Sequence, residues 1–482
     1  MEKPSVSAEA SPNASGTSGA VSAAQGDDPT VDPLTKLPTR RAFQQALTQA
    51  FARVTKDQAG PALLALDLDR FQAVNDSTGI VTGDLLLTRA AARIVGAVPQ
   101  GSTVARISGD EFTVLIPDAS AAEAVAERLL DLLGRTYAVN GHTVTLSVSI
   151  GLALAPQHGA DAVSLLRSAT IALHAAEADG KNKWRVFDPA MQAHASAQQQ
   201  LESDLRAVLE LNRRELGSAM AVEQFEVHYQ PQVDIGSGRL TGFEALVRWR
   251  HPDRGMVSPM LFIPLLEQIG LIGLLGDWVL NTACRAAAAW PVPHGGKPLT
   301  VSVNVSPIQL REGRAMVASV ARALKDSGLD PLRLDIEITE SAMLRDALET
   351  LQSLKGLGVG LSLDDFGTGF SSLSQLAGYP FDRLKIDKSF VDDLSGMGSK
   401  QTSVRDRAFW MIKAIASLGS GLGIGTTAEG VETAGQLDQV RSAGVTHMQG
   451  YLVARPLPEA QVRAQIDRLS APPLTDRPSH LE

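Results

Sequence analysis

The 482-residue chain has few of the features that mark cross-linked, membrane-embedded or polyanion-binding proteins. Its single cysteine, Cys284, cannot form an intramolecular disulfide, so we expect a structural thiol in a reducing compartment. Acidic residues outnumber lysine and arginine by 53 to 44, which argues against a nucleic-acid polymer as partner. No uncharged apolar run reaches the ~18 residues of a membrane helix, and the N-terminus lacks the apolar core of a signal peptide. These absences predict a cytoplasmic protein without a membrane span.

The chain does contain enough apolar material for more than one core. Hydrophobic residues make up 44% of it, and its length predicts two or three domains. Residues 1–29 are rich in Ser, Ala and Gly and have no aromatic residue, so burial cannot offset the entropy cost of ordering them. We therefore predict a disordered tail there, and a second short tail over 471–482.

Residues 30–189 alternate short apolar strands with helical segments. The stretches "ALLALDLD", "STVARIS", "EFTVLI" and "VTLSVSIGLAL" have strand character, and helical stretches lie between them. Gly109 and Asp110 separate two of these strands, and glycine suits a type II′ hairpin turn. The pattern predicts an α/β sandwich whose central, mostly antiparallel sheet is covered by helices.

Residues 190–222 are rich in Gln, Ala, Glu and Arg. Their leucines recur at near-helical spacing, at positions 201, 205, 209 and 216. We interpret this segment as a helical linker, although an extra helix of the second domain is an equally good interpretation. From 223 to 470, eight apolar strand segments alternate with helical stretches, which predicts a (β/α)8 TIM-like barrel. The overall fold class is α/β.

Polar or charged residues stand at the predicted carboxyl ends of all eight barrel segments, namely Gln230, Glu244, Asn304, Glu337, Asp364, Lys385, Glu429 and Gln449. Each alone is readily explained as a rim charge or a turn cap, but barrel enzymes place their chemistry at these ends. Carboxylate and carboxamide oxygens suit hard ions such as Mg²⁺ or Mn²⁺. Lys385 and Arg248 suit the non-bridging oxygens of an anionic phosphodiester. The set indicates phosphodiester hydrolysis assisted by two metal ions.

Seven stretches of this region, in order, carry a family resemblance: "EALVRW", "NVSPIQL", "IEITES", "DDFGTGFSSL", "LKIDKSFV", "AEGVET" and "QGYLVARP". They resemble the EAL-domain cyclic di-GMP phosphodiesterases, whose barrel is modified by an antiparallel first strand. The resemblance implies hydrolysis of cyclic di-GMP to linear pGpG by a homodimer. It implies two ions, Mg²⁺ or Mn²⁺, with the metal ligands Glu244, Asn304, Glu337, Asp364, Asp365 and Asp387.

The same resemblance implies the remaining roles in the barrel. The catalytic residues would be Glu429, Lys385, Glu244 and Asp364. The substrate-binding residues would be Gln230, Arg248, Gln449 and Lys385. Glu340 would anchor the loop that begins at residue 364.

Residues 30–189 resemble a GGDEF domain, the diguanylate cyclase fold, through "DPLTKLPTRRAF", "LDLDRFQAVNDSTGIVTGD", "RISGDEF" and "ADGKNKW". The resemblance implies one or two metal ions when GTP is bound, with the candidate ligands Asp67, Asp110 and Glu111. It implies GTP contacts from Asn75, Asp84 and Lys181.

Several residues of this region depart from the pattern of the family. Glu177 stands where a phosphate-binding lysine is expected, and Gln72 and Ile80 replace a lysine and a histidine. A carboxylate in place of a cation opposes the charge neutralisation that cyclisation of GTP needs, whereas the guanine and metal residues that would hold GTP remain. The leading hypothesis is therefore a phosphodiesterase whose GGDEF domain binds GTP as a regulatory module. A bifunctional cyclase and phosphodiesterase, and a non-catalytic cyclic di-GMP receptor, are the alternatives.

Overall fold

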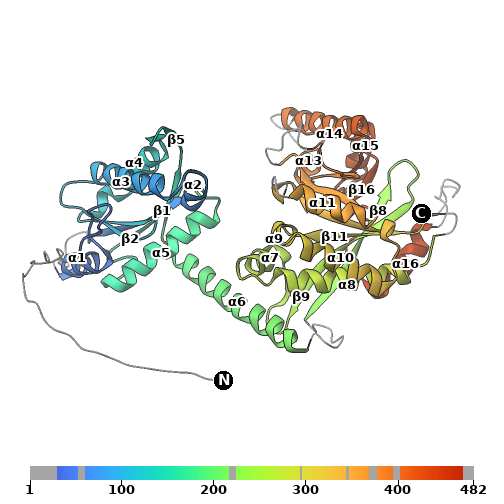
Figure 1. Cartoon of the computed structure of the whole chain (residues 1–482), viewed down its shortest axis with the longest axis horizontal. Helices are drawn as coiled ribbons and strands as arrows, with labels where there is room; N and C mark the ends of the chain where they lie inside the picture. Colours follow the sequence, from blue (N-terminus) through green and yellow to red (C-terminus); the bar gives the residue numbers. More distant parts are fainter. Residues whose placement is uncertain are drawn as a thin grey trace, which may run out of the picture. The chain divides into compact units, whose positions relative to one another are not determined.

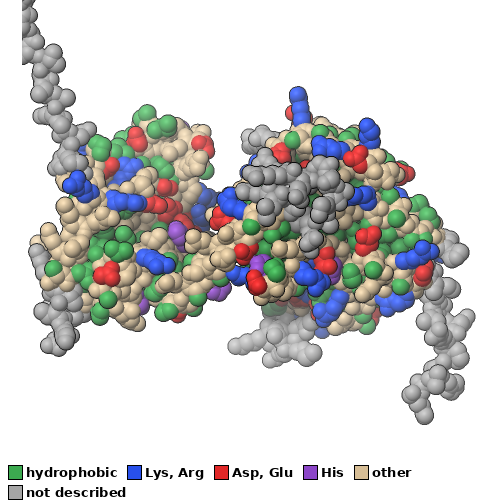
Figure 2. Space-filling model, turned by 90° about the horizontal axis from the view of Figure 1, so that it is seen from below, with side chains coloured by type: hydrophobic (Ala, Val, Ile, Leu, Met, Phe, Trp, Pro, Cys, Tyr) green, Lys and Arg blue, Asp and Glu red, His purple; other side chains and the backbone are tan. Residues whose placement is uncertain are grey.

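A computed structural model of the chain describes residues 30–52, 60–215, 224–293, 296–342, 347–368, 376, 378–394 and 402–470. It divides between residues 198 and 199 into two compact units, each of which is described by itself (Figure 1). The two tails expected at 1–29 and 471–482 lie outside the described residues. In the part of the chain that is described, no helix combines the length and apolarity needed to cross a membrane. On the face seen in Figure 2, acidic and basic side chains are interspersed.

The first unit is built on a five-stranded sheet with the order β2-β3-β1-β6-β7. Its strands are β1 (Ala62–Asp69), β2 (Thr103–Ser108), β3 (Glu111–Ile116), β6 (Ser147–Leu154) and β7 (Trp184–Val186). Its helices are α1 (Arg40–Ala52), α2 (Phe71–Thr78), α3 (Ile80–Ala97), η1 (Ala119–Ala121), α4 (Ala122–Gly134) and α5 (Ala162–Ala178). A separate two-stranded ribbon comprises β4 (Tyr137–Val139) and β5 (His142–Val144). Since only the β6–β7 pair of the main sheet is parallel, the prediction of a mostly antiparallel sheet is confirmed.

Strand β1 shows how the sheet buries both of its faces. Successive side chains point to opposite faces, and Leu64 and Leu66 pack in the core formed with α3 and α4. Leu63 and Ala65 pack in the core formed with α1 and α5. Helices therefore cover both faces of the sheet. The polar end of β1 lies next to the turn between β2 and β3.

That turn has the two-residue geometry expected from its glycine. Ser108 pairs with Glu111, so that Gly109 and Asp110 form the loop. Gly109 has a φ of 45°, and Asp110 is not among the described residues with a positive φ. A positive φ at the first loop position alone is the pattern of a type II′ turn.

The second unit is a closed barrel of eight strands. In barrel order they are β9 (Leu240–His251), β11 (Thr300–Val305), β12 (Leu334–Thr339), β13 (Gly360–Phe366), β14 (Arg383–Ile386), β15 (Gly425–Ala428), β16 (His447–Gln449) and β8 (Phe225–Asp234). Strand β8 is antiparallel to both of its neighbours, and the other barrel neighbours are parallel to each other. All eight predicted strand segments are confirmed, and so is the modified barrel.

Helices surround this barrel, and two short strands extend its sheet (Figure 1). The helices are α7 (Pro259–Gln268), α8 (Ile272–Ala289), α9 (Pro307–Arg311), α10 (Arg314–Ser327), η2 (Pro331–Arg333), η3 (Glu340–Ala342), α11 (Ala347–Gly356), α13 (Lys388–Asp393), α14 (Thr402–Leu422), α15 (Ala434–Ser442) and α16 (Glu459–Ser470). The short strands are β10 (Gly255–Val257) and β17 (Leu457–Pro458).

A single helix, α6 (Pro189–Glu215), crosses the division between the units. Its leucines at 201, 205 and 209 are buried in the core of the second unit. Asp204, on the same stretch, lies 3.1 Å from Nε2 of His251, at the end of β9. The leucine stripe is therefore a packing face for the barrel, as the alternative interpretation of this segment expects.

Two polar residues lie elsewhere on their strands than the sequence pattern predicts. Gln230 and Glu244 are opposite each other in the middle of β8 and β9, not at strand ends. The reason is that β9 continues past the barrel to pair with β10, and that β8 runs antiparallel. Their side chains still reach the barrel interior, since both residues are buried.

The imidazole of His447, on β16, makes the stability of the barrel depend on pH. Burial, aided by the charge of Arg383, lowers the pKa of His447 to about 4, below the ~6.5 of an unfolded chain. Because the pKa of His447 is depressed in the folded state, the contribution of its neutral imidazole to the free energy of unfolding is complete above pH ~6.5. This contribution is lost as the pH falls toward 4. Over this pH range, we expect the free energy of unfolding to fall by about 2 kcal/mol more in wild type than in His447→Gln. Urea unfolding at both pH values measures the difference, and identical pH slopes would contradict it.

Candidate active site

The buried ammonium of Lys385 occupies the centre of the barrel mouth. Its side chain is 1% exposed and projects from β14. Nζ lies 2.6 Å from Oε2 of Glu337 and 2.6 Å from Oε1 of Glu429. It lies 3.1 Å from Oδ1 of Asp364 and 3.6 Å from Oε2 of Glu244. Four strands or strand ends thus direct carboxylates at one cation.

Glu244 is fixed by carboxamides from two other strands. Asn304 donates to its Oε1 over 2.6 Å, and Gln449 donates to its Oε2. The same amide of Gln449 donates to Gln230 over 3.0 Å. Burial opposes ionisation of Glu244, but Lys385 and these hydrogen bonds lower its pKa. Glu244 is therefore an oriented, ionised acceptor.

The pKa shifts of Lys385, Glu337 and Glu429 indicate an excess of negative charge in this site. Burial disfavours the ammonium of Lys385, yet the surrounding carboxylates hold its pKa well above the usual range. Burial raises the pKa of Glu337 well above its usual range, and Glu244 and Asp364 add to the shift. Burial raises the pKa of Glu429 to about 8, although Lys385 opposes this shift. One lysine does not balance the acidic groups that meet here.

The donor set fits hard divalent cations. Glu244, Glu337 and Asp364 present oxygens within 4.8 Å of one another, and so do Asp364, Asp365 and Glu429. Oε1 of Glu337 is buried without a hydrogen-bond partner among the described residues. Buried carboxylates need compensating positive charge, and oxygen ligands are those that Mg²⁺ and Mn²⁺ prefer.

A β-bulge brings two consecutive carboxylates into this site. Neighbouring residues of a regular strand point to opposite faces, but the register shifts between Leu363 and Phe366. Within the shift, Asp365 adopts a φ of 55°, a conformation that is costly for a residue with a side chain. Burial raises the pKa of Asp365 to about 6, and the charges of Asp364 and Asp387 contribute. The bulge thus lets Asp364 and Asp365 serve one cluster.

A cavity of about 360 Å³ adjoins the carboxylates. Arg248, Asn304, Asp364 and Asp365 are among its lining residues. Burial lowers the pKa of Arg248 below its usual value. Its position is suited to an anionic group held next to the acidic cluster.

Glu340 lies where it can hold the start of the following loop. Its Oε2 accepts a hydrogen bond from the backbone N–H of Gly367 over 3.3 Å. The part of this loop over 369–375 lies outside the described residues.

A second acidic site lies in the first unit, where β1 ends near the β2–β3 turn. Burial raises the pKa of Asp67 to about 7, and the charges of Asp110 and Glu177 add to the shift. The charge of Lys181 opposes this rise of the pKa. Nζ of Lys181 lies 3.9 Å from Oδ1 of Asp69. Burial also raises the pKa of Asp110. The charge of Glu177 therefore acts on Asp67, one of the candidate metal ligands.

The two candidate guanine-binding residues are also neighbours. Oδ1 of Asn75, on α2, is buried without a hydrogen-bond partner among the described residues. A Cβ added to Gly83 would lie 1.8 Å from this oxygen. Asp84 follows Gly83 directly and is exposed on α3. The helices α2 and α3 thus hold the unsatisfied amide oxygen of Asn75 against Gly83, the residue before Asp84.

Comparison with known families agrees with this arrangement. The family model "EAL domain" matches residues 213–456, and "Diguanylate cyclase, GGDEF domain" matches residues 29–183. The chain is a tandem GGDEF–EAL protein. The bifunctional diguanylate cyclase/cyclic di-GMP phosphodiesterase MucR of Pseudomonas aeruginosa is 40% identical over 440 residues, 90% of this chain and 61% of that protein.

Other relatives of this GGDEF–EAL protein support the family and the fold. The cyclic di-GMP phosphodiesterase PdeR of Escherichia coli is 35% identical over 432 residues, 89% of this chain and 62% of that protein. This chain thus spans about three fifths of the length of both relatives. A Vibrio cholerae LapD structure with an S helix, GGDEF and EAL domains has 18% identity and a TM-score of 0.55, and the match covers 88% of this chain and 96% of that one. That likeness concerns the fold.

The structure of the EAL domain adds two residues that the sequence interpretation missed. Gln232 donates to Oε1 of Gln449 over 3.1 Å, and Arg383 donates to Gln232 over 3.3 Å. Together they fix the amide that holds Glu244. Gln232 stands two residues after Gln230, so the period-2 pattern of a strand was the signal that places both on one face.

The GGDEF domain adds Asp69. It is buried and accepts hydrogen bonds from Ser147 and Ser149 and from the backbone of Asn182. These partners belong to the sheet and to the loop after α5, so they fix the carboxylate of Asp69. This carboxylate in turn positions Lys181 beside Asp67. Asp69 lies two residues after Asp67 and so points to the same face of the strand, but no sequence signal distinguished its structural role.

Proposed function

We propose that the EAL domain hydrolyses one phosphodiester bond of cyclic di-GMP to give linear pGpG, with two Mg²⁺ or Mn²⁺ ions. The observation that carries the proposal is the excess of buried carboxylates around Lys385 at the mouth of the barrel. The names of MucR and PdeR, which both include cyclic di-GMP phosphodiesterase, agree with it.

The chemistry can be assigned to groups of the chain. Bound divalent ions would neutralise charge on the phosphoryl group and make the attacking water more acidic. The ligands would be Glu244, Asn304, Glu337, Asp364, Asp365 and Asp387.

Glu429 would accept the proton of the attacking water in its ionised form, which the ammonium of Lys385, 2.6 Å away, favours. Lys385 would orient that water and stabilise charge on the phosphorus oxygens. Arg248, Gln230 and Gln449 would hold the substrate. As water adds to phosphorus, the bond to one ribose oxygen breaks and a free hydroxyl results.

Product analysis tests this function directly. Purified protein is incubated with cyclic di-GMP and Mg²⁺, with and without GTP, and the nucleotides are separated by chromatography. We expect pGpG from wild type and none after removal of divalent ions with EDTA. Tight binding without pGpG would instead favour a non-catalytic cyclic di-GMP receptor.

We further propose that the GGDEF domain binds GTP as a regulatory module. Asn75 and Asp84 would recognise guanine, Lys181 would contact phosphate, and Asp67 and Asp110 would hold one or two ions, with Glu111 as a further candidate. Glu177 opposes cyclase activity, because its charge acts on the same site as Asp67.

A bifunctional protein is the second candidate, because the relative MucR is named a bifunctional enzyme. Cyclic di-GMP formed from GTP by a Glu244→Ala variant would establish it. Absence of that product, with GTP bound, would support the regulatory role. A homodimer is part of the proposal and is tested by light scattering.

The glycine beside Asn75 offers a sharp test of GTP binding. In Gly83→Ala the new Cβ would lie 1.8 Å from Oδ1 of Asn75 and 3.1 Å from the buried ring of Phe71, so the amide must move; GTP affinity should fall at least about tenfold, and stability should fall as well. Gly96→Ala, on the same helix, is the control, since its Cβ meets nothing within 4 Å. Calorimetric titration with GTP measures both variants. Equal affinities in wild type and Gly83→Ala would exclude Asn75 from the site.

A further inference from the structure

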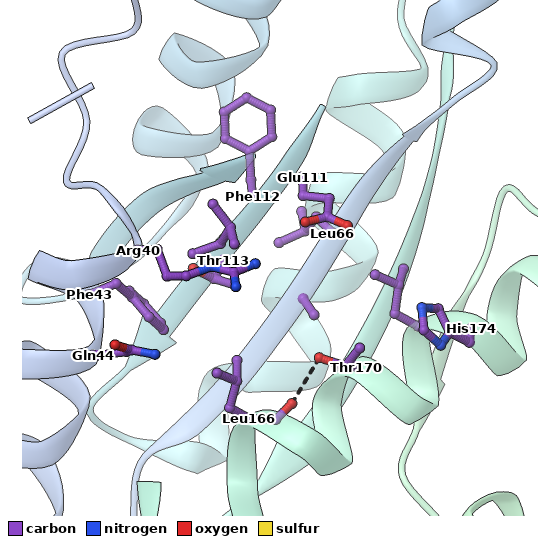
Figure 3. Close-up of a pocket in the computed structure, with 13 residues that line it drawn as sticks. Arg40, Phe43, Gln44, Leu66, Glu111, Phe112, Thr113, Leu166, Thr170 and His174 are labelled. Carbon is purple, nitrogen blue, oxygen red and sulfur yellow. Dashed lines mark hydrogen bonds between the residues drawn. The ribbon is translucent and has the colours of Figure 1, made fainter. Parts of the chain in front are cut away.

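A separate cavity of about 370 Å³ opens on the face of the GGDEF sheet that α1 and α5 cover (Figure 3). Its floor is apolar, with buried Phe43 from α1, Ala65 from β1 and Leu173 from α5. Exposed polar side chains surround the floor, and they come from α1, β3 and α5. The cavity therefore combines an apolar base with a polar rim.

An unsatisfied hydroxyl lies in this cavity. Thr113, on β3, is 4% exposed, and its Oγ1 has no hydrogen-bond partner among the described residues. A buried hydroxyl without a partner costs free energy, which a ligand that bonds to it recovers. Thr113 thus points to a polar group of a ligand at the base of the cavity.

The rim carries a cationic and an acidic side chain. Arg40, at the start of α1, forms no ion pair or side-chain hydrogen bond in the described part of the chain, and Figure 3 shows it among the lining residues. Glu111, on β3, also lines the cavity; its Oε2 accepts a hydrogen bond from Oγ of Ser108 over 2.7 Å, and its strand partner is Asp67. A ligand with one sign of charge would be attracted by one of these side chains and repelled by the other.

We propose that this cavity binds a small zwitterion with an apolar side chain, the chemistry of an apolar α-amino acid. Its carboxylate would accept hydrogen bonds from Arg40 and Thr113, since a guanidinium matches a carboxylate in geometry. Its ammonium would face Glu111. Its side chain would cover the half-buried Ile107 and Leu166, which line the cavity next to its apolar floor.

The same observations exclude other occupants. The volume is at the low end for ligand pockets, which suits one small molecule. The two phenylalanine rings of the lining are buried, Phe43 at 0% and Phe112 at 1% exposure, so neither offers an open face to a nucleobase, and the exposed ring of the lining is the imidazole of His174. Only Glu111 contributes a carboxylate to the lining, which is too few for a hard metal ion.

Isothermal titration of the full chain with L-leucine, and in parallel with L-phenylalanine, tests the proposal. We expect saturable binding of one molecule per chain. 4-Methylpentanoate lacks the ammonium and 3-methylbutylamine lacks the carboxylate, so each should bind at least about tenfold more weakly than leucine. Equal binding of these analogues, or no saturable binding of either amino acid, would overturn the proposal.

Two variants and a control locate the site. Arg40→Gln should weaken leucine binding at least about tenfold. Thr113→Val should weaken it several-fold and raise the unfolding temperature slightly, because the variant removes a buried hydroxyl that has no partner among the described residues. The neighbouring exposed Arg41 is absent from the lining, so Arg41→Gln should bind leucine as wild type does. Binding that is unchanged in Arg40→Gln, or lost equally in Arg41→Gln, would place the ligand elsewhere.

Discussion

Replacing Lys385 by methionine is expected to destabilise the barrel unit by about 3–5 kcal/mol in metal-free buffer. The ammonium is the buried cation that lies within 4 Å of Glu244, Glu337, Asp364 and Glu429. Without it the acidic groups repel one another or must take up protons. Urea unfolding in EDTA, followed by tryptophan fluorescence, measures the loss.

The effect of metal ions on this variant separates charge from packing. A divalent ion supplies the positive charge that Lys385→Met lacks, so Mn²⁺ should raise the unfolding temperature of the variant more than that of wild type. Lys325→Met, at an exposed position of α10, is the matched control and should change stability by less than about 0.5 kcal/mol. If Lys385→Met is as stable as wild type in EDTA, the carboxylates do not depend on this lysine for compensation.

Replacing Glu244 by glutamine is expected to lower the turnover of cyclic di-GMP about a thousandfold. Both oxygens of Glu244 accept hydrogen bonds, one from Asn304 and one from Gln449. A glutamine has only one oxygen, so its NH₂ group must face one of these donors, and the orientation of the site is lost as well as a charge. The rate of pGpG formation at saturating substrate measures the effect.

A surface variant and a metal titration control this experiment. Glu349→Gln makes the same chemical change at an exposed position of α11 and should retain wild-type turnover. Glu244→Gln should also require more Mn²⁺ for its residual activity, since a neutral amide binds a cation less tightly. Turnover of Glu244→Gln within a few-fold of wild type would remove Glu244 from the proposed metal ligands.

The fold follows largely from local patterns. The eight apolar segments of the barrel and the mostly antiparallel sheet were predicted, because burial of alternate strand residues leaves a period that is visible in one sequence. The φ of Gly109 follows from its lack of a side chain. The leucine stripe at 201, 205 and 209 was visible too, but the surface that it packs against was not.

The site was predicted as a list of residues and not as a network. The motif resemblance named Glu244, Glu337, Lys385 and Glu429, whereas their distances and opposing pKa shifts arise from chain segments more than forty residues apart. The bulge at Asp365 is a departure from strand periodicity that periodicity itself cannot predict. Gln232 and Arg383 have their roles only because barrel closure places β16 next to β8.

By itself, the sequence determined the strand and helix order, the two-unit α/β architecture and the residue types available for metal and phosphate chemistry. Only the tertiary structure decided which of these residues share a site, in which direction their pKa values shift, and that Thr113 and Arg40 line one cavity without a side-chain partner among the described residues. The physical reason is that side-chain alternation is a local property of the chain. Charge balance, burial and hydrogen-bond satisfaction depend on neighbours that folding brings from distant segments.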